Sequence, residues 1–255
     1  MVDRVTETVG DGLFVLWEAC RNLKEGLIKF AVVGGTDSKL SPWDIAGFIR
    51  LTAMSTRKCA PEEASAPCSR HRDGMVVGEG GVCFVLERYG DAKRRGAKIY
   101  AHIAGFGAAC GAGSLTETDP NAVARSVSQA CRYAGVGYDE IDLISAHATS
   151  TPSGDSKEVM GFNQAMGPSA RNPWAYNSKG SMGHWIVPAG LVSLAPAVLA
   201  LHRGVIPPNL NLKGDVDPAC DLRYAYETVE TKVKTALVTA LGFGNTDVAC
   251  VVQSV

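Results

Sequence analysis

The sequence predicts an α/β fold, and three observations lead to that prediction. Short apolar segments of strand length alternate with longer amphipathic segments along the 255-residue chain. Glycine or proline stands near most junctions between these segments. With 46% apolar and 20% charged residues, the composition is that of a globular protein with a sizeable core.

The front of the chain predicts one amphipathic helix among short strands. In a helix over 10–25, Leu13, Leu16 and Trp17 fall on one face, and Gly26 suits its end. We expect that apolar face to need a further layer to pack on. The neighbouring elements are expected as a strand around 2–8, a buried strand over 30–34, irregular structure over 37–72, and a strand pair or bent strand over 75–87.

The rest of the chain alternates strands and helices. Asp119 can cap a helix that begins at Pro120, runs to about Tyr133 and stops at Gly135. The other elements are expected as strands over 98–107, 141–146 and 174–178, helices over 155–166 and 186–203, and two terminal strands joined by a glycine-rich turn within 235–255.

Charge and apolar content exclude several classes of partner. A net charge of −1, with acids and bases interspersed, argues against nucleic acid and against a polybasic membrane patch. The chain starts with acidic residues instead of an apolar signal segment, and no run approaches the ~20 apolar residues of a membrane span. We therefore expect a cytoplasmic protein.

The eight cysteines form no CxxC pair and have no zinc-like spacing, so no metal site is expected. Most of them stand in apolar runs, such as Cys83 and Cys250. This distribution predicts buried free thiols in a reducing compartment.

Three polar, glycine-rich stretches follow directly on apolar strands, where α/β folds place ligand sites. They are SAHATSTPSGD at 145–155, NSKGSMGH at 177–184 and LGFGNT at 241–246. A fourth stretch, RDGMVVGEGGVCFVLE, covers 72–87.

These stretches resemble motifs of the β-ketoacyl synthases. The first is similar to the HGTST-PxGD loop, with Ala148 in place of a glycine, and the second to the K-x-x-x-G-H motif. The third resembles the terminal GFGGTN turn, and the fourth the RDGF-x-x-GEG segment. Four motifs in family order imply a thiolase-like αβαβα sandwich.

The resemblance assigns His147 and His184 to binding of a thioester carbonyl and of the enolate formed from a malonyl thioester. Neutral imidazoles can donate a hydrogen bond where that charge develops. We expect His184 to lie at the N-terminus of the helix over 186–203, whose partial positive charge favours the neutral ring.

Further positions gain roles from the resemblance. Lys179 matches a lysine that orders the histidines, and Glu158 matches its acidic partner, although Glu158 is equally readable as a plain helix-face charge. The pantetheine and substrate positions are Thr149, Thr151, Phe243 and Leu241. The two threonines are alternatively helix caps, and Phe243 is alternatively core packing. Leu241 stands where many members carry a gating phenylalanine.

The sequence departs from the family in two respects. Val9 occupies the position of the nucleophilic cysteine, and Cys20 lies about 16 Å further along the helix. The front of the N-terminal half is also absent, so the sandwich is expected to be incomplete. Residues 1–97 would be a remnant of the N-terminal half, and 98–255 a complete C-terminal half that carries both histidines.

These features predict one subunit of a split ketosynthase-like acyltransferase in fatty-acid or polyketide synthesis. A partner chain would supply the missing front, in a heterodimer or a dimer of heterodimers. The substrate carrier would be the phosphopantetheine of acyl carrier protein or coenzyme A, with no tightly bound cofactor. The alternatives are a non-catalytic subunit like a chain-length factor, a malonyl-thioester decarboxylase, and a binding or scaffold module.

Overall fold

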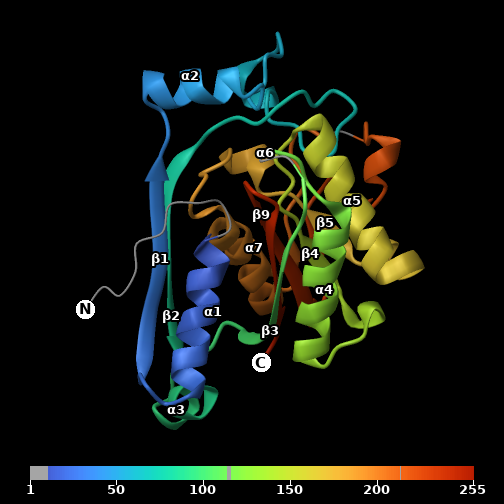
Figure 1. The fold of residues 1–255 in the computed structure, drawn as a ribbon. Helices are drawn as coiled ribbons and strands as arrows, with labels where there is room; N and C mark the ends of the chain where they lie inside the picture. Colours follow the sequence, from blue (N-terminus) through green and yellow to red (C-terminus); the bar gives the residue numbers. More distant parts are fainter. Residues whose placement is uncertain (1–10, 114–115, 213) are drawn as a thin grey trace.

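The structure is a computed structural model, and it describes residues 11–113, 116–212 and 214–255. A mixed sheet of six strands lies at its centre, in the spatial order β3-β10-β9-β4-β5-β7 (Figure 1). Its strands are β3 (His102–Cys110), β4 (Leu143–Ser145), β5 (Trp174–Tyr176), β7 (Arg223–Tyr224), β9 (Thr235–Gly242) and β10 (Thr246–Gln253). A separate two-stranded antiparallel sheet consists of β1 (Phe30–Ser38) and β2 (Glu79–Glu87); it is called the β1–β2 hairpin below, although residues 39–78 with α2 connect its strands.

Strand direction brings the motif-bearing loops to one edge of the central sheet. β4 runs parallel to both of its neighbours, β5 and β9, whereas β10 is antiparallel to β9. The carboxyl ends of β4, β5 and β9 therefore point the same way. The loops that follow them start with Ala146, Asn177 and Phe243, and the polar stretches found in the sequence thus meet at that edge.

Helices cover the outer face of this sheet. α4 (Pro120–Ala134) and α5 (Pro152–Met166) pack there side by side (Figure 1). Glycines of β3 let α4 come close, because a Cβ on Gly107 would lie 2.0 Å from the Ser126 carbonyl oxygen. A Cβ on Gly105 would lie 2.5 Å from the Ala130 carbonyl oxygen. The helix backbone thus rests almost directly on the strand.

The layer between the central sheet and the β1–β2 hairpin consists of α1 (Asp11–Lys24) and α7 (Ala189–Arg203). Leu13 and Leu16 of α1 are fully buried in the same apolar cluster as Leu191 of α7. Trp17 stacks on Phe106 of β3 with ring centroids 5.5 Å apart. The expectation that the apolar face of this helix needs a further layer is therefore wrong, because the chain itself covers that face.

The β1–β2 hairpin, by contrast, is covered on one face only by the residues that the structure describes. Its inner face packs on α1, whereas Phe30, Val32 and Val85 on its outer face are 64–67% exposed. Cys83 lies on the same outer face and is exposed, so the prediction that it is buried is wrong. All eight cysteines are free thiols, as the sequence predicts.

The irregular structure expected over 37–72 contains a helix, α2 (Pro42–Arg50). The Ser41 hydroxyl accepts a hydrogen bond from the Asp44 N–H, and Pro42 occupies the first turn, so the local signals are those of a helix start. α5 begins three residues earlier than expected and α7 three residues later, at Pro152 and Ala189.

The remaining regular elements are short; the structure has them as α3 (Tyr89–Arg94), α6 (Lys179–Met182), β6 (Val205–Ile206), β8 (Val229–Glu230), and the 3-10 turns η1 (Pro61–Glu63), η2 (Tyr138–Glu140), η3 (Gly167–Arg171) and η4 (Pro218–Cys220). The α/β prediction is confirmed, as sheets and helices alternate in layers. Among the described helices, none is long and apolar enough to cross a membrane.

Candidate active site

Two histidines from different loops meet at the edge where β4, β5 and β9 end. The imidazole centroids of His147 and His184 lie 5.4 Å apart, with the rings nearly perpendicular. Both side chains are buried, with 6% and 3% of their surface exposed. The resemblance gives both rings roles at one substrate, and the structure places them close together. Val9, the position matched to the nucleophilic cysteine, lies outside the described residues.

The peptide of His147 is held from both sides. Its N–H donates to Glu158 Oε1 at 2.9 Å and to the Thr239 hydroxyl at 3.2 Å, and its carbonyl accepts a hydrogen bond from Lys179 Nζ. The next N–H, of Ala148, donates to Glu158 Oε2 at 2.8 Å. Both oxygens of one carboxylate thus fix the loop that carries His147.

Lys179 and Glu158 act through this peptide and do not form a direct ion pair within 4.0 Å in the described part of the chain. Glu158 is 2% exposed, so it is not a plain helix-face charge. Burial raises the pKa of the Glu158 carboxyl above its usual value. Burial also lowers the pKa of Lys179 to about 8, against the opposing influence of Glu158.

His184 is held by its ring as well as by its backbone. The Ile186 N–H donates to His184 Nδ1 at 3.0 Å, so a neutral ring must carry its proton on Nε2. The His184 N–H donates to the Val76 carbonyl at 2.7 Å, and its carbonyl accepts from the Gly78 N–H at 2.9 Å. Among residues 11–113, 116–212 and 214–255, none accepts a hydrogen bond from His184 Nε2–H, so this donor is available to a ligand.

Burial and nearby positive charge keep both imidazoles neutral. The pKa of His147 is well below the usual value because of burial, then Lys179 and His184. The pKa of His184 is lowered by burial and then by Lys179. The helix-dipole explanation is corrected here, because α7 begins only at Ala189 and burial is the largest cause.

Trp185 fixes the segment after His184 against β2. Its indole lies so close to the hairpin that a Cβ on Gly80 would meet the ring at 2.4 Å. A Cβ on Gly78 would meet it at 2.7 Å. The indole N–H donates to the Met182 carbonyl at 2.9 Å, which closes the turn around His184.

Three residues beside the histidines have positive φ although they are not glycine. They are Ala148 at 29°, Ser150 at 70° and Ile186 at 51°. For a β-branched residue such as Ile186 this conformation is a true outlier. Backbone strain of this kind is retained where surrounding contacts enforce it, and it gathers at functional sites.

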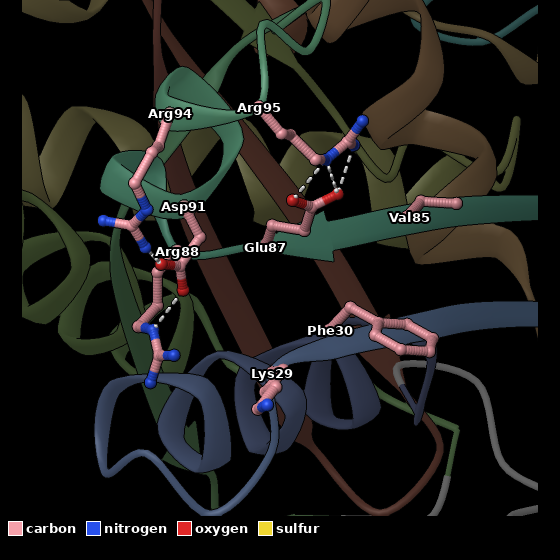
Figure 2. A pocket seen from close by; sticks show the side chains of 8 residues that line it. All are labelled: Lys29, Phe30, Val85, Glu87, Arg88, Asp91, Arg94 and Arg95. Carbon is pink, nitrogen blue, oxygen red and sulfur yellow. Dashed lines mark hydrogen bonds and ion pairs between the residues drawn. The ribbon is translucent and has the colours of Figure 1, made fainter.

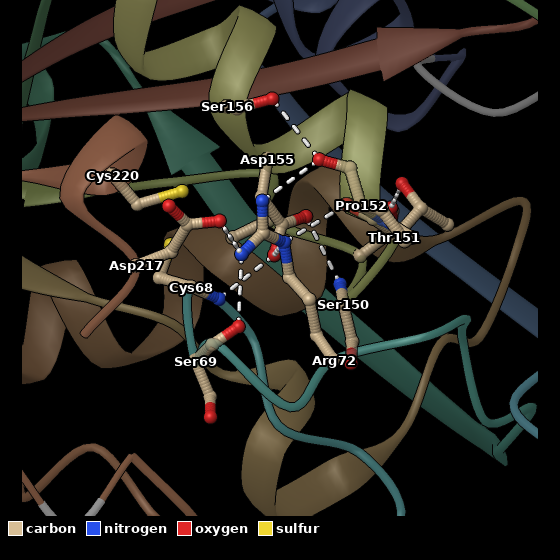
Figure 3. Close-up of polar contacts among 12 residues, drawn as sticks. Cys68, Ser69, Arg72, Ser150, Thr151, Pro152, Asp155, Ser156, Asp217 and Cys220 are labelled. Atoms are coloured by element: carbon tan, nitrogen blue, oxygen red, sulfur yellow. Dashed lines mark hydrogen bonds and ion pairs between the residues drawn. The ribbon is translucent and has the colours of Figure 1, made fainter. Parts of the chain in front are cut away.

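A buried cluster around Arg72 braces the loop that follows His147 (Figure 3). Arg72 donates to Asp217 Oδ2 and to the Pro152 carbonyl, both at 2.7 Å, and its Nε lies 3.6 Å from Asp155 Oδ2. Asp155 in turn accepts from the Ser150 N–H at 3.0 Å. Burial raises the pKa of Asp155 to about 6. The RDG motif thus stabilises the loop that follows His147, through the contacts of Arg72 with Pro152 and Asp155.

The structure also separates the alternatives for the expected substrate residues. The hydroxyls of Thr149 and Thr151 lie 3.0 Å apart and are partly buried. Thr151 precedes α5 without a side-chain capping hydrogen bond, so the capping interpretation fails for it. Phe243 is 40% exposed and hence not core packing, whereas Leu241 belongs to the core under α4 and α5.

Three residues of this site gained no role from the sequence. Thr239 donates to Glu158 Oε1 at 2.6 Å and is the hydroxyl that completes the carboxylate's contacts. Its signal was a hydroxyl in the middle of a strand, β9, that is otherwise apolar apart from Thr235 at its start. Arg72 and Asp155 stand inside motifs quoted above, where only their partners across the fold reveal what they do.

Two family models match the chain. The β-ketoacyl synthase N-terminal domain matches residues 12–92, and the β-ketoacyl synthase C-terminal domain matches residues 100–213. A mitochondrial 3-oxoacyl-[acyl-carrier-protein] synthase of Arabidopsis thaliana is 38% identical over 96% of this chain and 54% of its own length. 3-Oxoacyl-[acyl-carrier-protein] synthase 2 of Coxiella burnetii is 35% identical over 96% of this chain and 59% of its own length. The chain thus spans little more than half the length of these relatives.

Solved structures agree with these matches. A ketosynthase in complex with a type II polyketide acyl carrier protein superposes with a TM-score of 0.96 at 30% identity, over 100% of this chain and 63% of that one. The ishigamide ketosynthase/chain length factor gives a TM-score of 0.90 at 28% identity, over 98% of this chain and 60% of that one. With its layered α/β fold and its two buried histidines, the chain belongs to the β-ketoacyl synthase family, whose fold is thiolase-like.

Proposed function

We propose that this chain supplies the two-histidine half of a ketosynthase-type acyltransferase site in fatty-acid or polyketide synthesis. The observation that carries the proposal is the pair of buried imidazoles 5.4 Å apart, both held neutral by burial and by Lys179. Neutral rings can donate to a developing oxyanion without first losing a proton.

The proposed reaction begins with a malonyl thioester. The bond between its carboxylate and its α-carbon breaks, carbon dioxide leaves, and the electron pair passes into an enolate with charge on the thioester oxygen. His184 Nε2–H is the donor for that oxygen, because Nδ1 already accepts from Ile186. His147, held by Glu158 and Lys179, is the second donor. In a condensation, the enolate carbon then attacks the carbonyl carbon of an acyl thioester; a C–C bond forms, the C–S bond of that thioester breaks, and its sulfur leaves as a thiolate that takes up a proton.

The proposed carrier is the phosphopantetheine arm of acyl carrier protein or coenzyme A, without a tightly bound cofactor. Thr149 and Thr151 offer hydroxyls to such an arm, and the exposed ring of Phe243 offers an apolar wall. The solved ketosynthase in complex with an acyl carrier protein supports this carrier by its likeness to the chain.

A partner chain is proposed to complete the site. This chain spans 54–59% of its two relatives named above, and β1 and β2 pair only with each other among the described residues. With residues 1–97 as the remnant of the first half and 98–255 as the second half, the partner supplies the missing front. It also supplies any nucleophile, since Val9 has no reactive group. The assembly is then a cytoplasmic heterodimer or dimer of heterodimers.

The test is malonyl-thioester decarboxylation by the assembled complex. His147→Ala and His184→Ala should each lower the rate about 10²–10³-fold, the usual cost of one lost oxyanion donor. His202→Ala, on an exposed residue in the last turn of α7, and Val9→Ala should leave it unchanged. Equal loss in all four variants would indicate collapse of the fold. A complex without any decarboxylation that depends on these histidines would favour a non-catalytic subunit like a chain-length factor.

A further inference from the structure

One buried carboxyl group has no role in the site described above. Asp247, the second residue of β10, exposes only 2% of its surface. Its Oδ2 has no hydrogen-bond partner among residues 11–113, 116–212 and 214–255. Burial without a donor disfavours a carboxylate, because water stabilises the charge far better than an apolar interior does. Asp247 is thus an acid in surroundings that favour its neutral form.

An open pocket beside α3 shows the opposite situation (Figure 2). Its two acids each have a guanidinium partner: Glu87 accepts from Arg95 Nε at 2.9 Å. Asp91 accepts from Arg88 Nε at 2.7 Å. These hydrogen bonds lower the pKa of both carboxyl groups, which therefore stay ionised at neutral pH. In the described part of the chain, no such donor reaches Asp247 Oδ2.

The register of the central sheet brings Asp247 close to Glu158. Asp247 pairs with Leu241 of β9, and two residues further on Ala249 pairs with Thr239. Because cross-strand partners share a face, Asp247 and Thr239 are diagonal neighbours on one face. Thr239 donates to Glu158 Oε1 at 2.6 Å. The two buried carboxyl groups therefore lie near each other, between the central sheet and its outer helices.

The charged groups around Asp247 are two acids and one base. Glu158 faces it from α5, Asp119 from the start of α4, and Arg125 from within α4. The Arg125 guanidinium also donates to the Cys110 carbonyl at 2.9 Å. The partners of Asp247 on the flanking strands β3 and β9 carry no charge. Burial first, and then the two acids, raise the pKa of Asp247 to about 7, against the influence of Arg125.

Hydrogen bonds decide which of the two neighbouring acids carries a proton. Glu158 Oε1 accepts from the His147 N–H and the Thr239 hydroxyl, and Oε2 accepts from the next N–H along the chain. A proton on either oxygen of Glu158 would weaken these bonds, whereas Asp247 Oδ2 has none to lose among the described residues. Lys179 also favours the ionised form of Glu158. The proton therefore belongs on Asp247.

We propose that Asp247 is a neutral carboxylic acid at neutral pH and that it thereby positions the His147 loop. Its proton leaves Glu158 as the ionised acceptor that fixes this loop. Loss of the proton would set two carboxylates against each other in a buried place. The inference goes beyond the proposed function, because the location of the proton is testable without substrate or partner. Only the effect on His147 concerns the proposed reaction.

The first test compares urea unfolding of the wild-type chain and of Asp247→Asn from pH 5 to pH 9. The folded-state pKa of Asp247, about 7, lies above the ordinary value of about 3.9 in the unfolded chain. The stability that this proton contributes is therefore complete below about pH 4 and is lost as the pH rises through about 7. Relative to the variant, the wild-type unfolding constant should rise up to about tenfold per pH unit between pH 5 and pH 7 and level off above about pH 8. A constant ratio from pH 5 to pH 8 overturns the neutral acid.

Asp155→Asn is the matched control, because Asp155 is equally buried but both of its oxygens accept N–H bonds. Oδ2 accepts from Cys68 at 2.8 Å, and Oδ1 accepts from Ser150 at 3.0 Å. An amide in its place turns an NH2 group toward one of these donors. At pH 8 this control should raise the unfolding constant about tenfold or more, whereas Asp247→Asn should lower it. A rise for Asp247→Asn and for Asp247→Ser as well would contradict the proposal.

Amide hydrogen exchange, followed by nuclear magnetic resonance, tests the positioning of His147. The His147 and Ala148 N–H groups donate to Glu158, so their exchange reports how firmly the loop is held. At pH 6 the wild type and Asp247→Asn should exchange these amides at the same rate. At pH 8.5 the wild type should exchange them at least threefold faster, with the amides of β4 as the internal reference. The same ratio at both pH values, or an equal acceleration in β4, would rule out a positioning role.

Discussion

His147 and His184 lie close together, but the contacts that hold each of them in place differ. His147 is fixed through its peptide by buried charges from α5 and α6, while one of its ring nitrogens, Nδ1, has no hydrogen-bond partner among the described residues. His184 is fixed through ring Nδ1 and a backbone bridge to Val77, and within the part of the chain that the structure describes it has no hydrogen bond or ion pair with a charged side chain. The position of His147 thus depends on electrostatics, and that of His184 on backbone geometry.

We expect the largest effect on stability when the buried ammonium group of Lys179 is removed. Lys179→Met leaves the His147 carbonyl without its donor and Glu158 buried without its nearest positive charge. Removing this ammonium leaves a buried carboxylate uncompensated, which costs about 3–5 kcal/mol in the free energy of unfolding. The control is Lys157→Met, which removes a lysine paired with the exposed Glu117. It should lower the free energy of unfolding by less than about 0.5 kcal/mol. Urea unfolding measures both, and a Lys179→Met cost near that of Lys157→Met would contradict the electrostatic account of His147.

The pH dependence of stability tests a property that the two histidines share, a pKa lowered by burial. Their folded-state pKa values lie below the unfolded value because both rings are buried. Below about pH 6.5 the unfolded chain binds protons that the folded chain refuses, so stability falls as pH falls. Each histidine contributes up to about 1.4 kcal/mol per pH unit to this slope.

The measurement compares urea unfolding at pH 7 and pH 5. His147→Asn and His184→Asn should each flatten the acid slope by a similar amount, and the exposed His202→Asn should not change it. A flatter slope for His184→Asn alone would mean that the His147 ring titrates normally in the folded protein. The two histidines would then differ in their pKa shifts as well as in the contacts that hold them.

The smallest effect concerns strain in the His147 loop. Ala148 has φ 29°, a region that glycine enters more easily than alanine. Ala148→Gly should therefore stabilise the protein by about 0.5–1 kcal/mol. Ala146→Gly, two residues earlier and outside the positive-φ set, should destabilise it by a similar amount. Melting-temperature changes of opposite sign for the two variants support strain at Ala148. Equal destabilisation by both variants would contradict it.

Local signals in the sequence predicted elements well where both ends were marked. Asp119 caps α4 by accepting from the Asn121 N–H at 2.9 Å, and Gly135 ends it with φ 68°. α2 was missed although Ile45, Phe48 and Ile49 recur at helical spacing, because the helix is only nine residues long and contains Gly47. Residues over 37–72 therefore resembled loop, although Ser41 and Pro42 were a readable start.

For the site, motif order predicted that His147 and His184 meet, but not what holds them. Glu158 and Thr239 are 81 residues apart, and their contact exists only after β9 pairs with β4. The covered face of α1 was misjudged for the same reason, since its partner α7 lies far along the chain. Periodicity shows that a face is apolar and leaves open which element covers it.

The contact between Trp185 and Gly80 also limits which amino-acid substitutions this sequence can accept. A side chain at position 80 finds the indole ring 2.4 Å from its Cβ, and Gly80 itself has φ 157°. A side chain at position 80 therefore meets two obstacles: the Trp185 ring, which only a smaller residue at 185 would remove, and a backbone conformation that strains any side chain. Replacement of Trp185 first would leave a hollow beside His184, so each step depends on the other. We therefore expect substitutions at positions 80 and 185 to be coupled, with each single change less stable than the original pair.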